Sequence, residues 1–248
     1  MRTPSEPLTT TPSLPREIKL YMFSGSNSVR TAELMLHHKG IAYQEVILRR
    51  GAHATQLPAL GFSGRTVPAL EIDGLRVQRT REISRALDLI KPEPRLFPAD
   101  TADRVAVEDA ERWGEELQNA ARRLFYSAMT RTRADAVDQL AARAHGATDV
   151  AVRRDIAELP ARLDQIDAWI KAGVLGGDDL NAADFQIAPS IAWLLCFDDI
   201  APFLQRRPAA DHAIRVSGTN RRHIPRVLAE EWLTPLRMQG IDAARPAD

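Results

Sequence analysis

Residues Thr66-Val67-Pro68-Ala69-Leu70 place a proline at the entrance to a short apolar strand. Proline has no backbone N–H to donate, so in sheets it occurs at strand starts or on edge strands, and the bond before it is the one peptide bond that becomes cis at modest cost. We therefore predict a strand over 69–72 that follows a cis Val67–Pro68 bond. Such a turn would present the backbone N–H and C=O of Val67 outward, as fixed polar partners for an extended ligand.

The residues around this stretch alternate between strand and helix patterns. Apolar and polar residues alternate in Glu17–Met22, which predicts a strand, whereas Val29–Lys39 carries apolar residues at helical spacing and is followed by Gly40 as a stop signal. The Asp73-Gly74 pair predicts a tight hairpin turn. Together the patterns predict strands over 17–22, 41–48, 69–72 and 75–77, helices over 29–39 and 80–90, and a loop or short helix over 49–65.

Prolines at positions 92, 94 and 98 separate this β-α-β, β-β-α half from a half with helical patterns only. The longest of these patterns places Ala106, Ala110 and Leu117 on one face of a helix. The sequence therefore predicts an α/β domain over 17–91, a linker over 92–100 and an all-α domain over 101–248, after a tail over 1–16 that is rich in Thr, Ser and Pro and is expected to be disordered. A helix or helix-loop is predicted near 130–148, and further helices are predicted over 156–170, 182–197, 208–216 and 225–238.

The composition narrows the classes of partner. Lys plus Arg and Asp plus Glu number 33 each, so no bulk attraction to nucleic acid or to a membrane surface is expected. No apolar run is long enough to span a bilayer, and the six histidines have no metal-ligand spacing. Cys196 is the single cysteine, which excludes an internal disulfide and suits a reducing cytoplasm. We expect a cytoplasmic protein without a metal site.

The stretch Leu180-Asn181-Ala182-Ala183-Asp184 has the spacing of a helix capping box. Asn181 can accept hydrogen bonds from the amides of the first helical turn, and Asp184, three residues on, can accept from the Asn181 amide. We interpret the stretch as a stability device at the start of the most apolar helix, and we expect loss of Asp184 to cost roughly 1–2 kcal/mol.

With its motifs in this order and spacing, the chain resembles the cytosolic glutathione S-transferase family. The resemblance rests on 20–43, similar to the family's first strand, active-site turn and first helix, on 66–83, similar to its cis-proline segment and following helix, and on 180–184, similar to the capping box of its core helix. It implies an α/β plus all-α fold, with a thioredoxin-like N-terminal domain, a helical C-terminal domain and usually a homodimer. It also implies a detoxification enzyme that conjugates glutathione, as co-substrate and without a further cofactor, to a small electrophile.

The resemblance also implies a role for the serine-rich turn. A hydroxyl or thiol at the first strand–helix turn stabilises the thiolate of glutathione in the family, and Ser26 stands at that position here. Ser24 and Ser28 are the alternatives, since a small slip of the alignment would promote either. The alternative is that Ser26, Asn27 or Ser28 is only the helix cap, and the cap and donor roles are compatible. The turn has no cysteine, which argues against the branch of the family that reduces disulfides.

For the thiol ligand, the resemblance implies backbone pairing with Val67, directly before Pro68, and a hydroxyl contact from Thr80. The family has an acid beside that hydroxyl where this chain has Arg79, and an arginine cannot accept a hydrogen bond from an ammonium group. Glu82 or an acid from a partner subunit could take that place. Alternatively, Arg79 favours a more anionic ligand, so a different low-molecular-weight thiol is a further possibility.

The resemblance places the second substrate between the two domains. Arg123 and Tyr126 on the long predicted helix are the candidates to line that cleft, whereas Trp113 falls on the apolar face and is expected in the core. The alternative to an enzyme is a non-catalytic binding or interaction protein that keeps the fold. Arg79 favours this alternative, and the serine-rich turn favours the enzyme.

Overall fold

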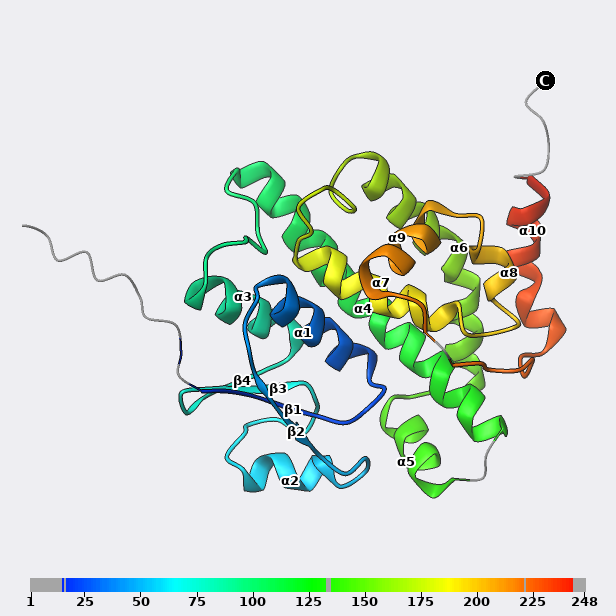
Figure 1. The fold of residues 1–248 in the computed structure, drawn as a ribbon. Helices are drawn as coiled ribbons and strands as arrows, with labels where there is room; N and C mark the ends of the chain where they lie inside the picture. The colour runs from blue at the N-terminus through cyan, green and yellow to red at the C-terminus, as the bar shows by residue number, and fades with distance from the viewer. Residues whose placement is uncertain (1–14, 16, 133–134, 221, 243–248) are drawn as a thin grey trace, which may run out of the picture.

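The computed structural model describes residues 15, 17–132, 135–220 and 222–242. Its first half is built on a four-stranded sheet with the strand order β2-β1-β3-β4. Strand β1 runs parallel to β2 and antiparallel to β3, which is antiparallel to β4. In Figure 1, α1 and α3 cover one face of the sheet and α2 lies on the other. The elements are β1 (Ile18–Met22), α1 (Asn27–His38), β2 (Gln44–Ile47), α2 (His53–Ala59), β3 (Ala69–Ile72), β4 (Leu75–Gln78) and α3 (Thr80–Ile90). The tail predicted over 1–16 lies outside the described residues, apart from Pro15.

The inner strands of the sheet are the apolar ones. Leu20 of β1 lies opposite Leu70 of β3, and both side chains are fully buried, while β2 and β4 form the more exposed edges. The Val67–Pro68 bond directly before β3 is cis, as predicted. Asp73 and Gly74 both have positive φ in the turn between β3 and β4, as a tight hairpin requires. The proline motif stands at the start of an inner strand.

The second half is helical and is built around α7. Every residue of α7 is buried, and the helix packs against α4, α9 and, in the first half, α1. Figure 1 shows α10 far from the sheet, where it packs on α6 and α8. The predicted fold class is confirmed. The elements are α4 (Thr101–Thr132), α5 (Ala136–Ala144), α6 (Asp149–Lys171), α7 (Ala182–Leu194), α8 (Ala201–Leu204), α9 (Pro208–Ser217), the 3-10 helix η1 (Glu230–Leu233) and α10 (Thr234–Asp242).

Some element boundaries differ from the prediction. The first helix begins two residues earlier than expected, and α8 is a single turn that no periodicity could indicate. The helix predicted over 225–238 is wrong in its first part, because 225–229 is not helical. There Asp199 accepts hydrogen bonds from the N–H groups of Val227 and Leu228, at 2.8 and 3.0 Å. A side chain from a distant part of the sequence thus satisfies these backbone groups in place of a helix.

A buried lysine holds the connection between the two halves. Lys39, fully buried at the end of α1, donates to Asp88 of α3 and to the carbonyl oxygens of Lys91 and Pro92, the last two at 2.6 and 3.2 Å. A buried ammonium group needs such a set of acceptors because its desolvation is costly. These contacts hold the end of α3 against α1, at the point where 92–100 leads into α4.

The capping box at the start of α7 is confirmed. Asn181 Oδ1 accepts from the N–H of Ala183, and Asp184 Oδ2 accepts from the N–H of Asn181, both at 2.9 Å. The Asp184 carboxylate makes further contacts, because its Oδ1 accepts from the N–H of Gly176 at 2.8 Å and lies 2.6 Å from Nε2 of His212. Asp184 therefore ties the start of α7 both to the preceding loop and to α9.

Candidate functional site

A cavity of about 950 Å³ lies between the sheet half and the helices α4, α5 and α7. One wall comes from the turns that precede α1, β3 and α3. The other wall comes from one face of α4, from α5 and from residues 222–224. Its volume is large enough to enclose most of a small organic ligand. The cavity is lined by six of the predicted site residues, Ser26, Val67, Pro68, Arg79, Thr80 and Tyr126.

The turn before α1 carries a chain of hydroxyl groups. Ser26 is the N-cap of α1, and its Oγ accepts from the N–H of Val29 at 3.4 Å. The hydroxyl oxygens of Ser26 and Ser28 lie 3.0 Å apart, and Ser28 donates to the carbonyl oxygen of Val67 at 3.2 Å. Because each hydroxyl has one proton and Ser28 gives its own to Val67, Ser26 donates to Ser28 in this arrangement. Rotation of the Ser26 hydroxyl would turn its proton toward a ligand.

Next to Ser26, a buried amide faces the cavity without a partner. Asn27 is 1% exposed, and neither its Nδ2 nor its Oδ1 has a hydrogen-bond partner among the residues that the structure describes. Buried amides are nearly always bonded, so this one indicates a place for polar groups of a ligand. The sequence indicates Asn27 only as a possible helix cap, because its burial depends on helices that are distant in the chain. Ser24 also lines the cavity and is exposed.

Val67 lines the cavity and has hydrogen-bonding capacity left on both of its backbone polar groups. Its carbonyl oxygen accepts one hydrogen bond, from Ser28, and has a second lone pair. In the described part of the chain, no group accepts a hydrogen bond from its N–H. An extended peptide could pair with both groups in the manner of an added β-strand. Because Val67 leads directly into β3, an inner strand of the sheet orients these groups.

Thr80 and Arg79 border the cavity at the start of α3. Thr80 is buried at the first position of the helix. Arg79 precedes it with a φ of 67°, a conformation that costs a residue with a side chain roughly 1–3 kcal/mol. Glu82, one candidate acid for an ammonium group, is exposed and does not line the cavity. Glu115 of α4 does line it, and no other carboxylate of the described residues does so.

The expectation that Arg123 lines the cleft is wrong. Its guanidinium makes two hydrogen bonds to Asp155 of α6, 2.6 and 2.8 Å long, and does not reach the cavity. The adjacent Arg122 lines the cavity instead, with Nη1 and Nη2 at 3.1 and 3.3 Å from the amide oxygens of Asn119 and Gln118. One residue corresponds to about 100° of rotation around a helix. The sequence alone does not say which face of α4 meets the first domain.

Tyr126 lines the cavity as predicted, on a face of α4 that changes from polar to apolar along its length. The residues of this face are three or four positions apart in the sequence, which brings their side chains to one side of the helix. Because this face carries both polar and apolar residues, the sequence pattern does not mark it. The pattern marks only the apolar face that packs in the core. Trp113 packs edge-on against Trp169 of α6, with ring centroids 5.1 Å apart, and does not line the cavity. The cavity face of α4 comprises Glu115, Gln118, Asn119, Arg122, Phe125, Tyr126 and Met129.

A histidine of the second wall is held in its neutral form. The ring of His145 stacks on Tyr126, with centroids 5.2 Å apart and planes 7° apart. Burial, followed by the charge of Arg122, lowers the pKa of His145 to about 4. The pKa of His53, which also lines the cavity, is lowered as well, mainly by burial. The cavity therefore disfavours additional positive charge.

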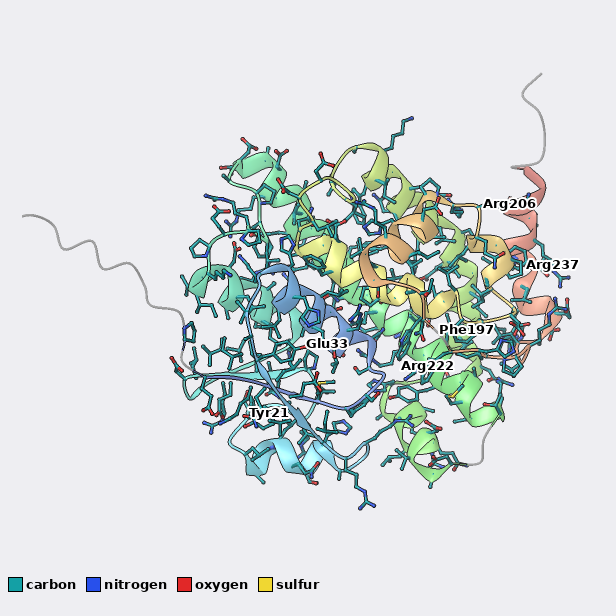
Figure 2. The ribbon with its side chains drawn as sticks, viewed as in Figure 1. Tyr21, Glu33, Phe197, Arg206, Arg222 and Arg237 are labelled. Atoms are coloured by element: carbon teal, nitrogen blue, oxygen red, sulfur yellow. The ribbon has the colours of Figure 1, made fainter. Side chains whose placement is uncertain are left out.

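Arg222 joins the two walls. Its guanidinium lies against the backbone of Gly25, where an added Cβ atom would come within 1.5 Å of Nη2. The same guanidinium lies over the rings of Phe125 and Trp193, at 5.5 and 5.7 Å from their centroids. Figure 2 labels Arg222 in this position, between the start of α1 and the helices α4 and α7. The φ of 85° favours glycine at position 25, and the absence of a side chain there lets the guanidinium approach the backbone.

The remaining chemically reactive groups do not add to the site. Cys196 is buried outside the cavity lining, and burial raises the pKa of its thiol to about 11, which makes it unreactive at neutral pH. Within the described ranges, no three His, Cys, Asp or Glu side chains come close enough together to hold a metal ion. The helices described here include none that is long and apolar enough to cross a membrane.

Comparison with known proteins finds a match in sequence for part of the first half, and a match in fold for both halves. Residues 20–95 match the family model of the glutathione S-transferase N-terminal domain. No curated protein matches the sequence significantly. A solved glutathione S-transferase from Rhodospirillum rubrum F11 superposes with a TM-score of 0.60 at 21% identity, over 88% of this chain and 99% of that one.

Two further solved structures also match the fold of this chain. A glutathione S-transferase from Methylobacterium radiotolerans, in complex with glutathione sulfonate, matches with a TM-score of 0.61 at 18% identity, over 86% of this chain and 98% of that one. Glutathione transferase F7 from Populus trichocarpa matches with a TM-score of 0.64 at 17% identity, over 89% of this chain and 98% of that one. At these identities the likeness establishes the fold, and the resemblance expected from the sequence is confirmed.

Proposed function

We infer the function from two premises: the N-terminal domain of this chain belongs to the glutathione S-transferase family, and the whole chain has that family's fold. We propose that the protein is a glutathione transferase, which joins the sulfur of glutathione to a small electrophile. The observation that carries the proposal is the hydroxyl chain of Ser26 and Ser28, which ends on the backbone of Val67 inside the cavity.

The reaction needs a thiolate at neutral pH, where a free thiol with a pKa of about 8.5 is mostly protonated. The Ser26 hydroxyl and the N-terminal end of α1 both stabilise negative charge at that place. With an aryl halide, the thiolate sulfur attacks the carbon that bears the halogen. The carbon–sulfur bond forms, the halide leaves with the bonding electrons, and the thiol proton goes to water. Ser26 keeps its proton and serves as a hydrogen-bond donor throughout.

The first wall of the cavity suits a tripeptide thiol. In the proposed complex, the backbone of Val67 pairs with the cysteinyl residue, while Thr80 and Arg79 bind the γ-glutamyl carboxylate. Glu115 accepts hydrogen bonds from the γ-glutamyl ammonium group, which an arginine cannot do. The complex of the Methylobacterium radiotolerans protein with glutathione sulfonate supports this choice of ligand.

Calorimetry with glutathione, followed by an assay of chlorodinitrobenzene conjugation, tests the proposal. Binding, and turnover above the uncatalysed rate, are expected. S-methylglutathione has no ionisable thiol and serves as the control, because it is expected to bind and not to react. Absence of both glutathione binding and turnover at millimolar thiol would refute the proposed function.

A second candidate is a non-catalytic protein that binds a thiol through the same fold. The observation in its favour is Arg79, which stands where the family has an acid. Glutathione binding without any turnover would support this candidate. The variant Arg79→Glu shows whether Arg79 limits the affinity: tighter glutathione binding in the variant would mean that the arginine, and not the fold, selects against glutathione.

The homodimer, the cytoplasmic location and a role in detoxification stay predictions from the family resemblance. Sedimentation velocity measures the oligomeric state directly. A molecular mass twice that of the chain is expected, and a monomer at micromolar concentration would contradict the prediction.

A further inference from the structure

The cavity carries more positive charge than the proposed thiol ligand accounts for. Glu115 is the one carboxylate among the described residues in its lining. Arg65 and Arg79 belong to the first wall, in the segments before β3 and α3, and Arg79 is proposed to bind the γ-glutamyl carboxylate of glutathione. Three further arginines line the cavity, Arg50, Arg122 and Arg222.

These three arginines differ in their partners. Arg50 forms an ion pair with Asp138 of α5, which compensates its charge. The guanidinium of Arg222 is packed against Gly25 and over two aromatic rings. Arg122 has only neutral amide oxygens for hydrogen-bond partners, and no carboxylate of the described residues lies within ion-pair distance of it. Among the residues that the structure describes, Arg122 is therefore a cation of the second wall without an ion-pair partner, and Glu115 of the same helix attracts it only from a longer distance.

The surroundings of Arg122 make an anion favourable there. Burial lowers the pKa of Arg122, because the charged guanidinium has lost part of its hydration. Beside it, Gln118 is 4% exposed, and its Nε2 has no hydrogen-bond partner in the part of the chain that the structure describes. The two side chains are in contact, since Gln118 Oε1 accepts from Arg122 at 3.3 Å. A guanidinium whose hydrogen bonds in the described residues go to neutral amide oxygens, and an amide N–H without an acceptor there, thus lie together in a cavity.

The wall next to this pair of donors is aromatic. The rings of Phe125 and Trp193 have centroids 4.4 Å apart and planes 35° apart, and Phe125 meets Tyr126 edge-on at 5.5 Å. Such rings favour a flat, unsaturated ligand. Arg222 lies over two of them and adds a second cation on the same wall.

We propose that the second substrate is an aromatic electrophile with a carboxylate, and that Arg122 and Gln118 bind this carboxylate. One guanidinium fork and one amide donor match the two oxygens and single charge of a carboxylate, whereas a phosphate would bring a third oxygen and further charge. The inference rests on the proposed function, because it assigns the electrophile of that same reaction. The reacting carbon then lies at the end of the substrate that is directed toward Ser26.

Two aryl halides that differ in charge test the inference. Chlorodinitrobenzoate and chlorodinitrobenzamide share the leaving group and the nitro groups, and only the first is an anion. Each kcat/KM with glutathione is divided by the uncatalysed rate constant, which removes the difference in intrinsic reactivity. The wild-type protein is expected to prefer the benzoate by roughly tenfold to a hundredfold, the range for a hydrogen bond to a charged group. Arg122→Gln is expected to lose this preference.

Arg112→Gln is the matched control. Arg112 lies on the same helix and carries the same charge, and it pairs with Asp109 on the exposed surface. Its replacement changes the net charge of the protein by the same amount as Arg122→Gln. The wild-type preference for the benzoate is expected to persist in this variant. A preference lost equally in both variants would mean that the general field of the protein selects the anion, and would overturn the assignment to Arg122.

Binding measured without thiol separates this inference from the proposed function. Dinitrobenzoate and dinitrobenzamide, which have no leaving group, are titrated into the wild-type protein by calorimetry, and tighter binding of the benzoate is expected. If the benzoate binds more tightly and no conjugation occurs with any halide, the anion site stands and the transferase proposal fails. Equal binding of the two compounds would overturn the anion site, even if chlorodinitrobenzamide is conjugated.

Discussion

Ser28 donates a hydrogen bond to the carbonyl oxygen of Val67 at 3.2 Å, and this contact joins the first turn of α1 to the segment that leads into β3. The Ser28 hydroxyl has one proton, and it donates that proton in this hydrogen bond. Ser26, whose hydroxyl oxygen lies 3.0 Å from that of Ser28, therefore has the proton that can turn to a ligand. The geometry favours Ser26 over Ser28, which the sequence leaves open as an alternative donor.

Replacing Ser26→Ala is expected to slow conjugation much more than it weakens glutathione binding. A hydrogen bond to a charged group contributes roughly 1.5–3 kcal/mol, so its loss raises the pKa of the bound thiol by about one to two units. At neutral pH kcat is therefore expected to fall about tenfold to a hundredfold, with recovery at higher pH. Steady-state kinetics over a range of pH and calorimetry with glutathione measure the two effects separately.

Ser24→Ala is the control for this prediction. Ser24 lines the same cavity and is exposed, so its loss is expected to leave the pH profile unchanged. Ser28→Ala is expected to have an intermediate effect, since it removes the group that orients both Ser26 and Val67. A greater loss of kcat in Ser24→Ala than in Ser26→Ala would move the donor role to Ser24.

Replacing Asp184→Ala is expected to destabilise the protein by more than a helix cap alone would. The carboxylate also accepts from the N–H of Gly176 and contacts His212, and a buried group left without its partner costs about 1–3 kcal/mol. With two such groups and a cap of about 1 kcal/mol, a loss of roughly 3–7 kcal/mol is expected in urea unfolding. Asp135→Ala removes the exposed N-cap of α5 and is expected to cost about 1 kcal/mol. Equal losses in the two variants would mean that Asp184 acts only as a cap.

Stability is expected to fall as the solution is acidified, in part through His145. Folding holds the pKa of His145 at about 4, below its ordinary value of 6.5. Between these values the unfolded chain binds more protons than the folded one, so the free energy of unfolding decreases as the pH falls. His145→Gln lacks this contribution and is expected to lose less stability than the wild type between neutral pH and a pH within that window. Urea unfolding at the two pH values measures the difference; identical losses would contradict the lowered pKa.

Elements with strong local signals were predictable from the sequence. Ala69–Ile72 and Thr80–Ile90 begin and end where the patterns place them, because a proline, a tight turn and helical spacing mark them locally. The capping box of Asn181 and Asp184 was predictable for the same reason. The non-helical course of 225–229 was not, because the acceptor for its amides is Asp199, far away in the chain.

By itself, the sequence determined the framework of this protein: the order of the strands and of the longer helices, the cis turn before β3 and the serine-rich turn before α1. Such features arise from the dihedral preferences and hydrogen bonds of neighbouring residues. Only the tertiary structure decided that Arg122 faces the cavity and Arg123 faces Asp155, and that Asn27 and Gln118 are buried with unpartnered amide groups. The physical reason is that periodicity defines the faces of a helix, whereas burial and charge compensation depend on the elements that pack against each face.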